Sequence, residues 1–248
     1  VTKRMGKIAD GSTISDYDKE EVKRQFSIST SLVPLEYNGE NGPIKINLLD
    51  TPGYFDFVGE VEEAMSVADA AIIVVNCKAG IEVGTEKAWE LCEEYRLPRL
   101  IFVTNMDDDQ ASFRELILKL EKRFGRKIAP FQVPIRENEK FVGFVNVVKM
   151  GGRRFTNLSD YEECEIPEYT KKNLNIVRDA LIEAVAETSE EYMERYFSGE
   201  EFTQEEISAA QRACDRGKYR SRIDGFRSER PGLLPPAPGH RQILPVPG

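Results

Sequence analysis

The sequence is poor in the residues on which metal and disulfide chemistry depend. It contains a single histidine, His240, and four cysteines that form no CxxC pair. Cysteines scattered in this way suit neither a zinc site nor a disulfide framework, so we expect reduced, buried thiols in a cytoplasmic protein. The four are Cys77, Cys92, Cys164 and Cys214.

Long apolar runs are missing too. No stretch approaches the ~18 residues that span a bilayer, so we predict no membrane partner. Residues 1–12 contain no apolar signal core and do not begin with methionine, which leads us to expect that the chain begins inside a longer protein. The net charge of −9 argues against a general nucleic-acid-coating surface and predicts no DNA partner.

Apolar residues recur at spacings that predict strands and helices in alternation. Residues 13–30 are polar and read as irregular, whereas 31–37 and 44–49, joined by Asn, Gly and Pro, read as a hairpin. Short connections between the later elements indicate an α/β fold with a mostly parallel sheet flanked by helices. Further strands are predicted at 71–75 and 99–104, and helices at 58–68, 85–95 and 113–124.

From residue 130 the pattern changes to that of a small α+β subdomain. Residues 131–135 and 141–148 read as a hairpin that 150–155 extends. Two acidic helices are predicted at about 168–187 and 189–198, followed by a capping box at Thr203-x-x-Glu206. We therefore predict an inserted subdomain over residues 130–210, attached to an α/β core over residues 1–129.

Residues 211–248 have a different composition. They hold eight Lys or Arg against three acids, and six of the 13 prolines, without apolar periodicity. By composition this tail is predicted to be disordered. Two origins are open: a reading-frame shift near Gln211, which we favour, and a Pro-rich tail that binds a partner.

The strongest chemical signal is Asp50-Thr51-Pro52-Gly53, which directly follows a predicted strand. An aspartate at the end of a strand can hold Mg²⁺ through water, and a glycine just beyond it lets a backbone N–H approach a terminal phosphate. A plain turn is the alternative, because Asp, Pro and Gly all favour turns.

The longer string DTPGYFDFVGEVEEAMSVAD, residues 50–69, resembles a segment of elongation factor G and its relatives. Residues 23–29 resemble the first switch of that family, 70–107 the run up to its guanine-reading motif, and 133–150 its inserted subdomain. The resemblance covers residues 1–210. It implies a P-loop-NTPase-type fold and a ribosome-associated translational GTPase, in which GTP hydrolysis is coupled to elongation. GTP or GDP and Mg²⁺ would be its cofactors and the ribosome its partner.

The resemblance also implies roles for individual residues. Asp50 would hold Mg²⁺ through water, Ser27 would ligate Mg²⁺ directly, and Gly53 would donate its N–H to the γ-phosphate. Asp107 would accept hydrogen bonds from guanine. The expected nucleotide-binding residues are Asp50, Thr51, Pro52, Gly53, Thr104, Asn105 and Asp107.

The guanine motif departs from the family pattern NKMD. Here the same frame reads Thr104-Asn105-Met106-Asp107, and a shifted reading, Asn105-x-x-Asp108, restores the usual spacing. We prefer Asp107, because the alignment then needs no gap. A third interpretation treats these aspartates as a solvated loop, and it suits Asp108 and Asp109 better than Asp107.

Two further departures concern hydrolysis. Tyr54 stands where the family has a water-orienting histidine, and losing such a group commonly costs ~10²–10⁴ in rate. No G-x-x-x-x-G-K-[ST] phosphate-binding loop occurs in the 248 residues. We therefore expect an incomplete parallel sheet and no useful GTP binding by this chain.

Several alternatives are open. The nearest is a ribosomal-protection GTPase of the tetracycline-resistance kind, which shares this domain. From another class comes a degenerate protein that binds a partner without turning over nucleotide. The acidic helices read as a solvated face, although in the family this subdomain meets ribosomal stalk proteins.

Overall fold

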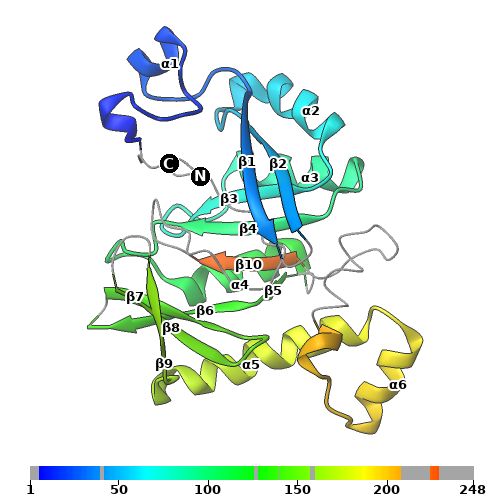
Figure 1. Cartoon of the computed structure of the whole chain (residues 1–248). Coiled ribbons are helices and arrows are strands. Elements are labelled where there is room, and N and C mark those ends of the chain that lie inside the picture. The colour runs from blue at the N-terminus through cyan, green and yellow to red at the C-terminus, as the bar shows by residue number, and fades with distance from the viewer. Residues whose placement is uncertain are drawn as a thin grey trace. The chain divides into compact units, whose positions relative to one another are not determined.

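The computed structural model describes residues 6–39, 42–125, 128–138, 140–156, 160–207 and 224–228 (Figure 1). Chain contacts divide these residues into two compact units, the first ending at Ala68 and the second spanning Asp69–Arg230. The domain boundaries predicted at 129/130 and 210/211 stay predictions, because a division by contacts does not test where a subdomain was inserted.

The first unit is built around the predicted hairpin. Strands β1 (Ser31–Gly39) and β2 (Gly42–Asp50) pair antiparallel, with Ser31 opposite Asp50 at the open end. Alternate residues of β2 are more buried, as expected for a sheet with one covered face. The remaining elements are η1 (Ile8–Asp10), α1 (Lys19–Arg24), η2 (Phe55–Phe57) and α2 (Val58–Val67).

Helix α1 corrects the prediction that residues 13–30 are irregular. Its N-terminus is closed by a capping box: the Asp18 side chain accepts from the N–H of Glu20 at 2.8 Å, and Glu21 accepts from the N–H of Asp18 at 3.2 Å. The interpretation failed because it relied on apolar periodicity. A helix this short is specified by its cap, which satisfies N–H groups that otherwise lack partners.

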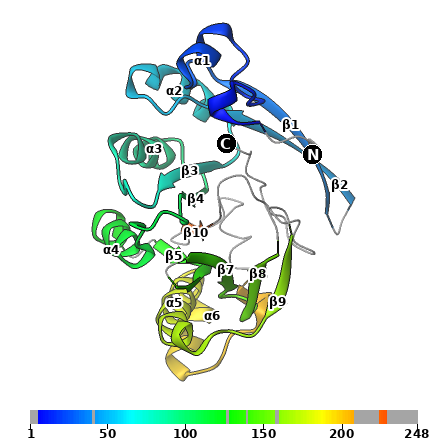
Figure 2. The same cartoon turned by 90° about the vertical axis from the view of Figure 1, so that its left-hand side faces the viewer.

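The second unit contains the predicted parallel sheet. Its order is β3-β4-β10-β5, and every neighbouring pair is parallel. Helices α3 (Val83–Glu94) and α4 (Phe113–Phe124) lie on one face of it (Figure 2). The α/β prediction is thereby confirmed. The strands are β3 (Ala71–Asn76), β4 (Arg99–Thr104), β5 (Ile128–Pro130) and β10 (Asp224–Ser228).

Strand β10 corrects the predicted tail. Residues 224–228 were expected to be disordered, yet they pair with β4 on one side and β5 on the other. The prediction relied on apolar periodicity, and residues 224–228 lack the apolar run that a central strand of a parallel sheet usually has. The other residues of the predicted tail lie outside the described residues, and the reading-frame hypothesis stays a prediction.

The predicted α+β pattern is also present in the second unit. An antiparallel sheet of order β6-β7-β8-β9 lies beside α5 (Glu168–Ala186) (Figures 1 and 2). Leu181 and Val185 of α5 are fully buried together with Val145 and Val147. Of the four strands of this sheet, β9 alone was not predicted from the sequence. The strands are β6 (Gln132–Glu137), β7 (Lys140–Asn146), β8 (Gly151–Phe155) and β9 (Tyr161–Cys164).

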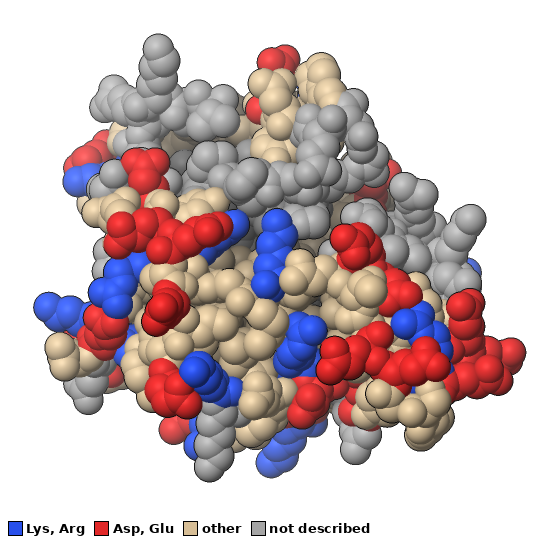
Figure 3. All heavy atoms as spheres, turned by 60° about the horizontal axis from the view of Figure 1, so that its bottom comes forward, with Lys and Arg blue, Asp and Glu red and all other residues tan. Residues whose placement is uncertain are grey.

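The surface around helix α6 (Glu190–Ser198) is acidic. Figure 3 shows carboxylates gathered over this region, with few Lys or Arg among them. This agrees with the interpretation of the acidic helices as a solvated face, and the contact with ribosomal stalk proteins stays a prediction. Within the described residues, no helix is both long and apolar enough to cross a membrane.

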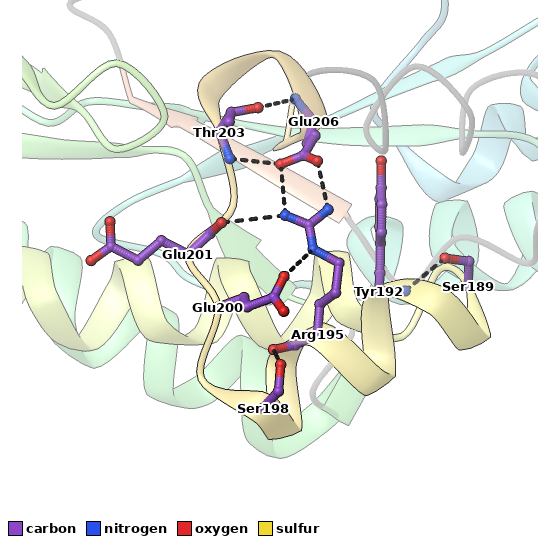
Figure 4. Close-up of polar contacts among 8 residues, drawn as sticks. All are labelled: Ser189, Tyr192, Arg195, Ser198, Glu200, Glu201, Thr203 and Glu206. Carbon is purple, nitrogen blue, oxygen red and sulfur yellow. Dashed lines mark hydrogen bonds and ion pairs between the residues drawn. The ribbon is translucent and has the colours of Figure 1, made fainter.

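Helix α6 is tied to the turn that follows it through Arg195 (Figure 4). The guanidinium bonds Glu206 at 2.6 Å and Glu200 at 3.1 Å. Glu206 also accepts from the N–H of Thr203, whose hydroxyl accepts from the N–H of Glu206, so the predicted capping box is confirmed. The ion pair with Arg195 and the capping hydrogen bond from Thr203 therefore hold the same carboxylate, that of Glu206.

This arrangement predicts an acid-sensitive turn. Arg195 and the N–H of Thr203 lower the pKa of Glu206 from its ordinary 4.5 to about 2. Because the folded pKa is depressed, the stabilisation is complete above pH 4.5 and is lost as the pH falls towards 2. Carboxyl NMR titration is expected to show this low pKa in the native chain and a return towards 4.5 in Arg195→Met. An unshifted Glu206 in the native chain would contradict the prediction.

Candidate functional site

Asp50 ends strand β2 inside a small polar network. The Ser15 hydroxyl hydrogen-bonds the Asp50 carboxylate, and Ser31 Oγ donates to the Ser15 carbonyl at 2.6 Å. Ser15 and Ser31 are both buried. The Asp50 carboxylate is therefore held by Ser15, which lies before α1 and is itself held by Ser31, the first residue of β1.

Burial raises the pKa of Asp50 above its ordinary value, and the negative charges of Asp16 and Glu21 raise it further. The Ser15 hydrogen bond opposes this shift. Ser27 lies in the same network, since its Oγ donates to Asp16 Oδ1 at 2.7 Å. A desolvated carboxylate among like charges, with hydroxyl donors nearby, is an environment that a bound cation would relieve.

These residues fit Mg²⁺ better than most metals. The donors are hard oxygens and few, which suits an ion that keeps several waters. No cluster of three or more His, Cys, Asp or Glu that could hold a metal occurs among the described residues.

Replacing Asp50 with asparagine is expected to stabilise the chain at pH 7. Because the folded pKa is raised, ionisation disfavours the folded state, and stability falls as the pH rises from 3.8 through the folded pKa. Urea unfolding should give a higher free energy of unfolding for Asp50→Asn than for the native chain, and this difference should narrow as the pH falls towards 3.8. Asp56→Asn, at an exposed position, is the control. A variant less stable than the native chain at pH 7 would contradict the prediction.

Gly53 is not required by the fold. Its φ is outside the left-handed region, and a Cβ added there would meet no atom within 4 Å. Pro52 is buried, Thr51 half-buried and Gly53 exposed. Neither packing nor backbone conformation therefore demands a glycine here, and no atom of the described chain lies where its Cβ would be.

Tyr54, the residue expected at the water-orienting position, is 58% exposed. Its ring packs edge-on against Phe26 with centroids 4.8 Å apart, and Phe26 also contacts Phe57. Aromatic pairs of this kind contribute about 0.5–1.5 kcal/mol beyond burial. The contact joins the segment that holds Ser27 to the segment after Gly53.

Glu21 is the residue of this network that the sequence interpretation missed. It is 3% exposed, and its Oε1 accepts from the N–H groups of Ile28 at 2.9 Å and Ser29 at 3.1 Å. The next N–H, of Thr30, donates to Glu60 Oε2 at 2.6 Å. Two carboxylates thus fix the backbone around Ser27. The spacing Asp18-x-x-Glu21 was the available signal.

In the second unit, the polar residues gather at the carboxyl ends of β3 and β4. The Cys77 N–H donates to the Thr104 carbonyl at 3.0 Å, and Asn76 Nδ2 donates to Asn105 Oδ1 at 3.1 Å. Asn105 has a left-handed φ of 56°. The carboxyl ends of parallel strands are where ligands of open α/β sheets bind.

The neighbouring aspartates differ in what their carboxylates do. Asp108 accepts from the Gln110 N–H at 2.8 Å and pairs with Lys78 at 3.4 Å, and these contacts lower its pKa. Asp107 is exposed and makes no hydrogen bond within the described part of the chain. The geometry therefore favours Asp107 over Asp108 as the residue whose carboxylate is available to a ligand.

Comparison with known proteins agrees with these observations. A family model described as the elongation factor Tu GTP-binding domain matches residues 1–214. A crystal structure of a protein from Thermus thermophilus matches with a TM-score of 0.83 and 33% identity. That match covers 92% of this chain and 33% of the other, so the chain spans about a third of that protein's length.

Proposed function

The chain belongs to the elongation factor Tu GTP-binding domain family, and we propose that it is the guanine-nucleotide domain of an elongation-factor-G-like GTPase that acts on the ribosome. GTP binding would order the segments that hold Ser27 and Tyr54, and hydrolysis would release them. The family match supports GTP chemistry in general. The ribosome and the elongation step follow only from the resemblance.

The observation that carries the proposal is the exposed carboxylate of Asp107, which makes no hydrogen bond among the described residues, beside Asp108, whose carboxylate is engaged within the loop. A site that reads guanine needs an acceptor pair facing the N1–H and the exocyclic amine, and a carboxylate supplies both oxygens. Asp108 is excluded by its own contacts with Gln110 and Lys78. We propose that Asp107 selects guanine over adenine.

The remaining roles are assigned by position. Asp50, through water, and Ser27 would hold Mg²⁺, whose charge would offset that of the phosphates. Gly53 would donate its N–H to the γ-phosphate, with Thr51 and Pro52 shaping the turn. Tyr54 can donate a hydrogen bond to water but cannot accept a proton as imidazole does near neutral pH. We therefore propose slow hydrolysis.

A titration of the 248-residue chain followed by amide NMR tests base recognition directly. Millimolar GDP with Mg²⁺ is expected to shift the amides of residues 105–111, and ADP is not. Equal shifts with both nucleotides, or none with either, would contradict the proposal. At micromolar concentrations of a fluorescent GDP analogue we expect no binding, because the sequence contains no phosphate-binding loop.

The same missing motif favours a second candidate, a domain that binds a partner without nucleotide turnover. The two candidates differ in the NMR titration, since a non-binding domain would show no base-dependent shifts. The ribosomal-protection alternative shares the domain and is not separated by any residue of this chain.

A further inference from the structure

Arg136 lies in strand β6, away from the residues assigned to the nucleotide, yet its guanidinium reaches the loop that carries Asp107. Nη2 donates to the carbonyl oxygens of Met106 and, at 3.4 Å, of Asp108. These two carbonyls belong to the residues on either side of Asp107. One side chain therefore contacts the backbone on both flanks of the proposed base-reading residue.

The ladder between β6 and β7 is irregular beside Arg136. The pairing of β6 with β7 shifts between Ile135 and Arg136, so that Ile135 faces Gly143 whereas Arg136 faces Phe141. Val142 of β7 is the extra residue, and bulges of this kind are over-represented beside functional sites.

The guanidinium of Arg136 binds backbone carbonyls instead of a carboxylate. Among the described residues it makes no ion pair, and its Nε is buried without a hydrogen-bond partner. Enclosing a guanidinium without a carboxylate is unfavourable unless its hydrogen bonds compensate. Here the compensating partners are the carbonyl oxygens of Met106 and Asp108, so the guanidinium is bound to the backbone of the loop.

The rest of the loop is fixed from within. The Ala111 N–H donates to the Asp108 carbonyl at 3.0 Å, and the Gln110 N–H donates to the Asp108 side chain. Met106 is fully buried. With Arg136 bound to the same carbonyls, the backbone near Asp107 is held from the loop and from β6, while the Asp107 carboxylate is left exposed.

We propose that Arg136 is a positioning residue for base recognition, which holds the 106–108 backbone so that Asp107 points at the guanine. This rests on the proposed function of Asp107. It also connects β6, the first strand of the predicted inserted subdomain, to the base-reading loop.

The test uses Arg136→Met, which removes the donors but keeps the apolar stem, and Arg136→Lys, which keeps the charge but not the fork. Arg154→Met is the matched control: Arg154 belongs to the same sheet, and its guanidinium pairs with Glu137 instead of the loop. Hydrogen exchange of the Asp108, Gln110 and Ala111 amides is measured without nucleotide. The GDP and ADP titrations are then repeated.

In Arg136→Met these amides are expected to exchange at least about tenfold faster, the equivalent of one hydrogen bond to a charged group. The GDP-specific shifts of residues 105–111 should also disappear. Arg136→Lys is expected to lie between Arg136→Met and the native chain, and Arg154→Met to match the native chain.

Unchanged loop exchange in Arg136→Met would overturn the proposal. So would equally faster exchange throughout β6 and β7, which would mark Arg136 as a packing residue of the sheet. If Arg136→Met does not fold, native-like exchange and base shifts in Arg136→Lys would overturn it as well. Faster loop exchange in Arg136→Met, with no base-dependent shift in the native chain, would support the backbone contact while refuting the role of Asp107.

Discussion

Asp107→Ala is expected to abolish the discrimination between guanine and adenine nucleotides while leaving the fold intact. Two hydrogen bonds from guanine to a carboxylate are each worth about 1.5–3 kcal/mol. Losing both weakens GDP binding by at least about 3 kcal/mol, or ~150-fold. Binding that is already weak then passes beyond detection. The measurement is the amide NMR titration with GDP and ADP.

The neighbouring aspartates supply matched controls. Asp109→Ala removes the same charge two residues away and should leave base-dependent shifts unchanged. Asp108→Ala removes the acceptor for the Gln110 N–H and the partner of Lys78, so it should loosen the loop and weaken binding through disorder. Base selectivity that survives in Asp107→Ala and vanishes in Asp108→Ala would instead support the reading Asn105-x-x-Asp108.

Urea unfolding separates these outcomes further. Asp107 makes no hydrogen bond within the described residues, so its replacement should leave stability within about 0.5 kcal/mol. Asp108 caps its own loop, and its replacement should lower stability measurably. A large loss of stability in Asp107→Ala would show that this carboxylate has a structural role.

Most of the fold could be predicted because apolar periodicity and caps agree in it. Strand β4 and helix α4 begin and end at the predicted residues, the latter between Ser112 and Gly125. Strand β9 and helix α1 were missed, because one has no apolar alternation and the other is specified by its cap. Strand β10 was missed because residues 224–228 lack the apolar run that a central strand of a parallel sheet usually has.

Of the proposed site, the sequence predicts only the residues that would contact the nucleotide. Asp50, Gly53 and Asp107 belong to short motifs whose chemistry can be read from spacing. Glu21 and Arg136 do not, since each acts on backbone groups that are distant in sequence. Contacts such as that of Arg136 with residue 106 become visible only when the chain is folded.

Glu21→Ala is expected to be the most damaging single substitution in the first unit. The buried carboxylate accepts from the backbone N–H groups of Asp18, Ile28 and Ser29. A hydrogen bond to a charged group contributes about 1.5–3 kcal/mol. Losing all three should therefore destabilise the segment that holds Ser27 by about 3 kcal/mol or more.

This effect is expected to be local. The first unit should open around residues 13–30 without global unfolding, because segments of a protein can open separately. Hydrogen exchange of the Ile28 and Ser29 amides should accelerate by ~150-fold, the equivalent of about 3 kcal/mol. Any stabilisation by Mg²⁺ should be lost at the same time, since the backbone that carries Ser27 is then no longer held by Glu21.

Two further variants make the experiment decisive. Glu20→Ala, on the same helix, removes an exposed carboxylate that pairs with Arg24, so it should cost no more than ~0.5 kcal/mol. Glu21→Gln keeps one oxygen that can accept from Ile28 and Ser29 but presents an amide NH₂ group to the N–H of Asp18, so an intermediate effect is expected. Unchanged exchange at Ile28 and Ser29 in Glu21→Ala would show that water replaces the carboxylate, and that the backbone around Ser27 is ordered by something other than Glu21.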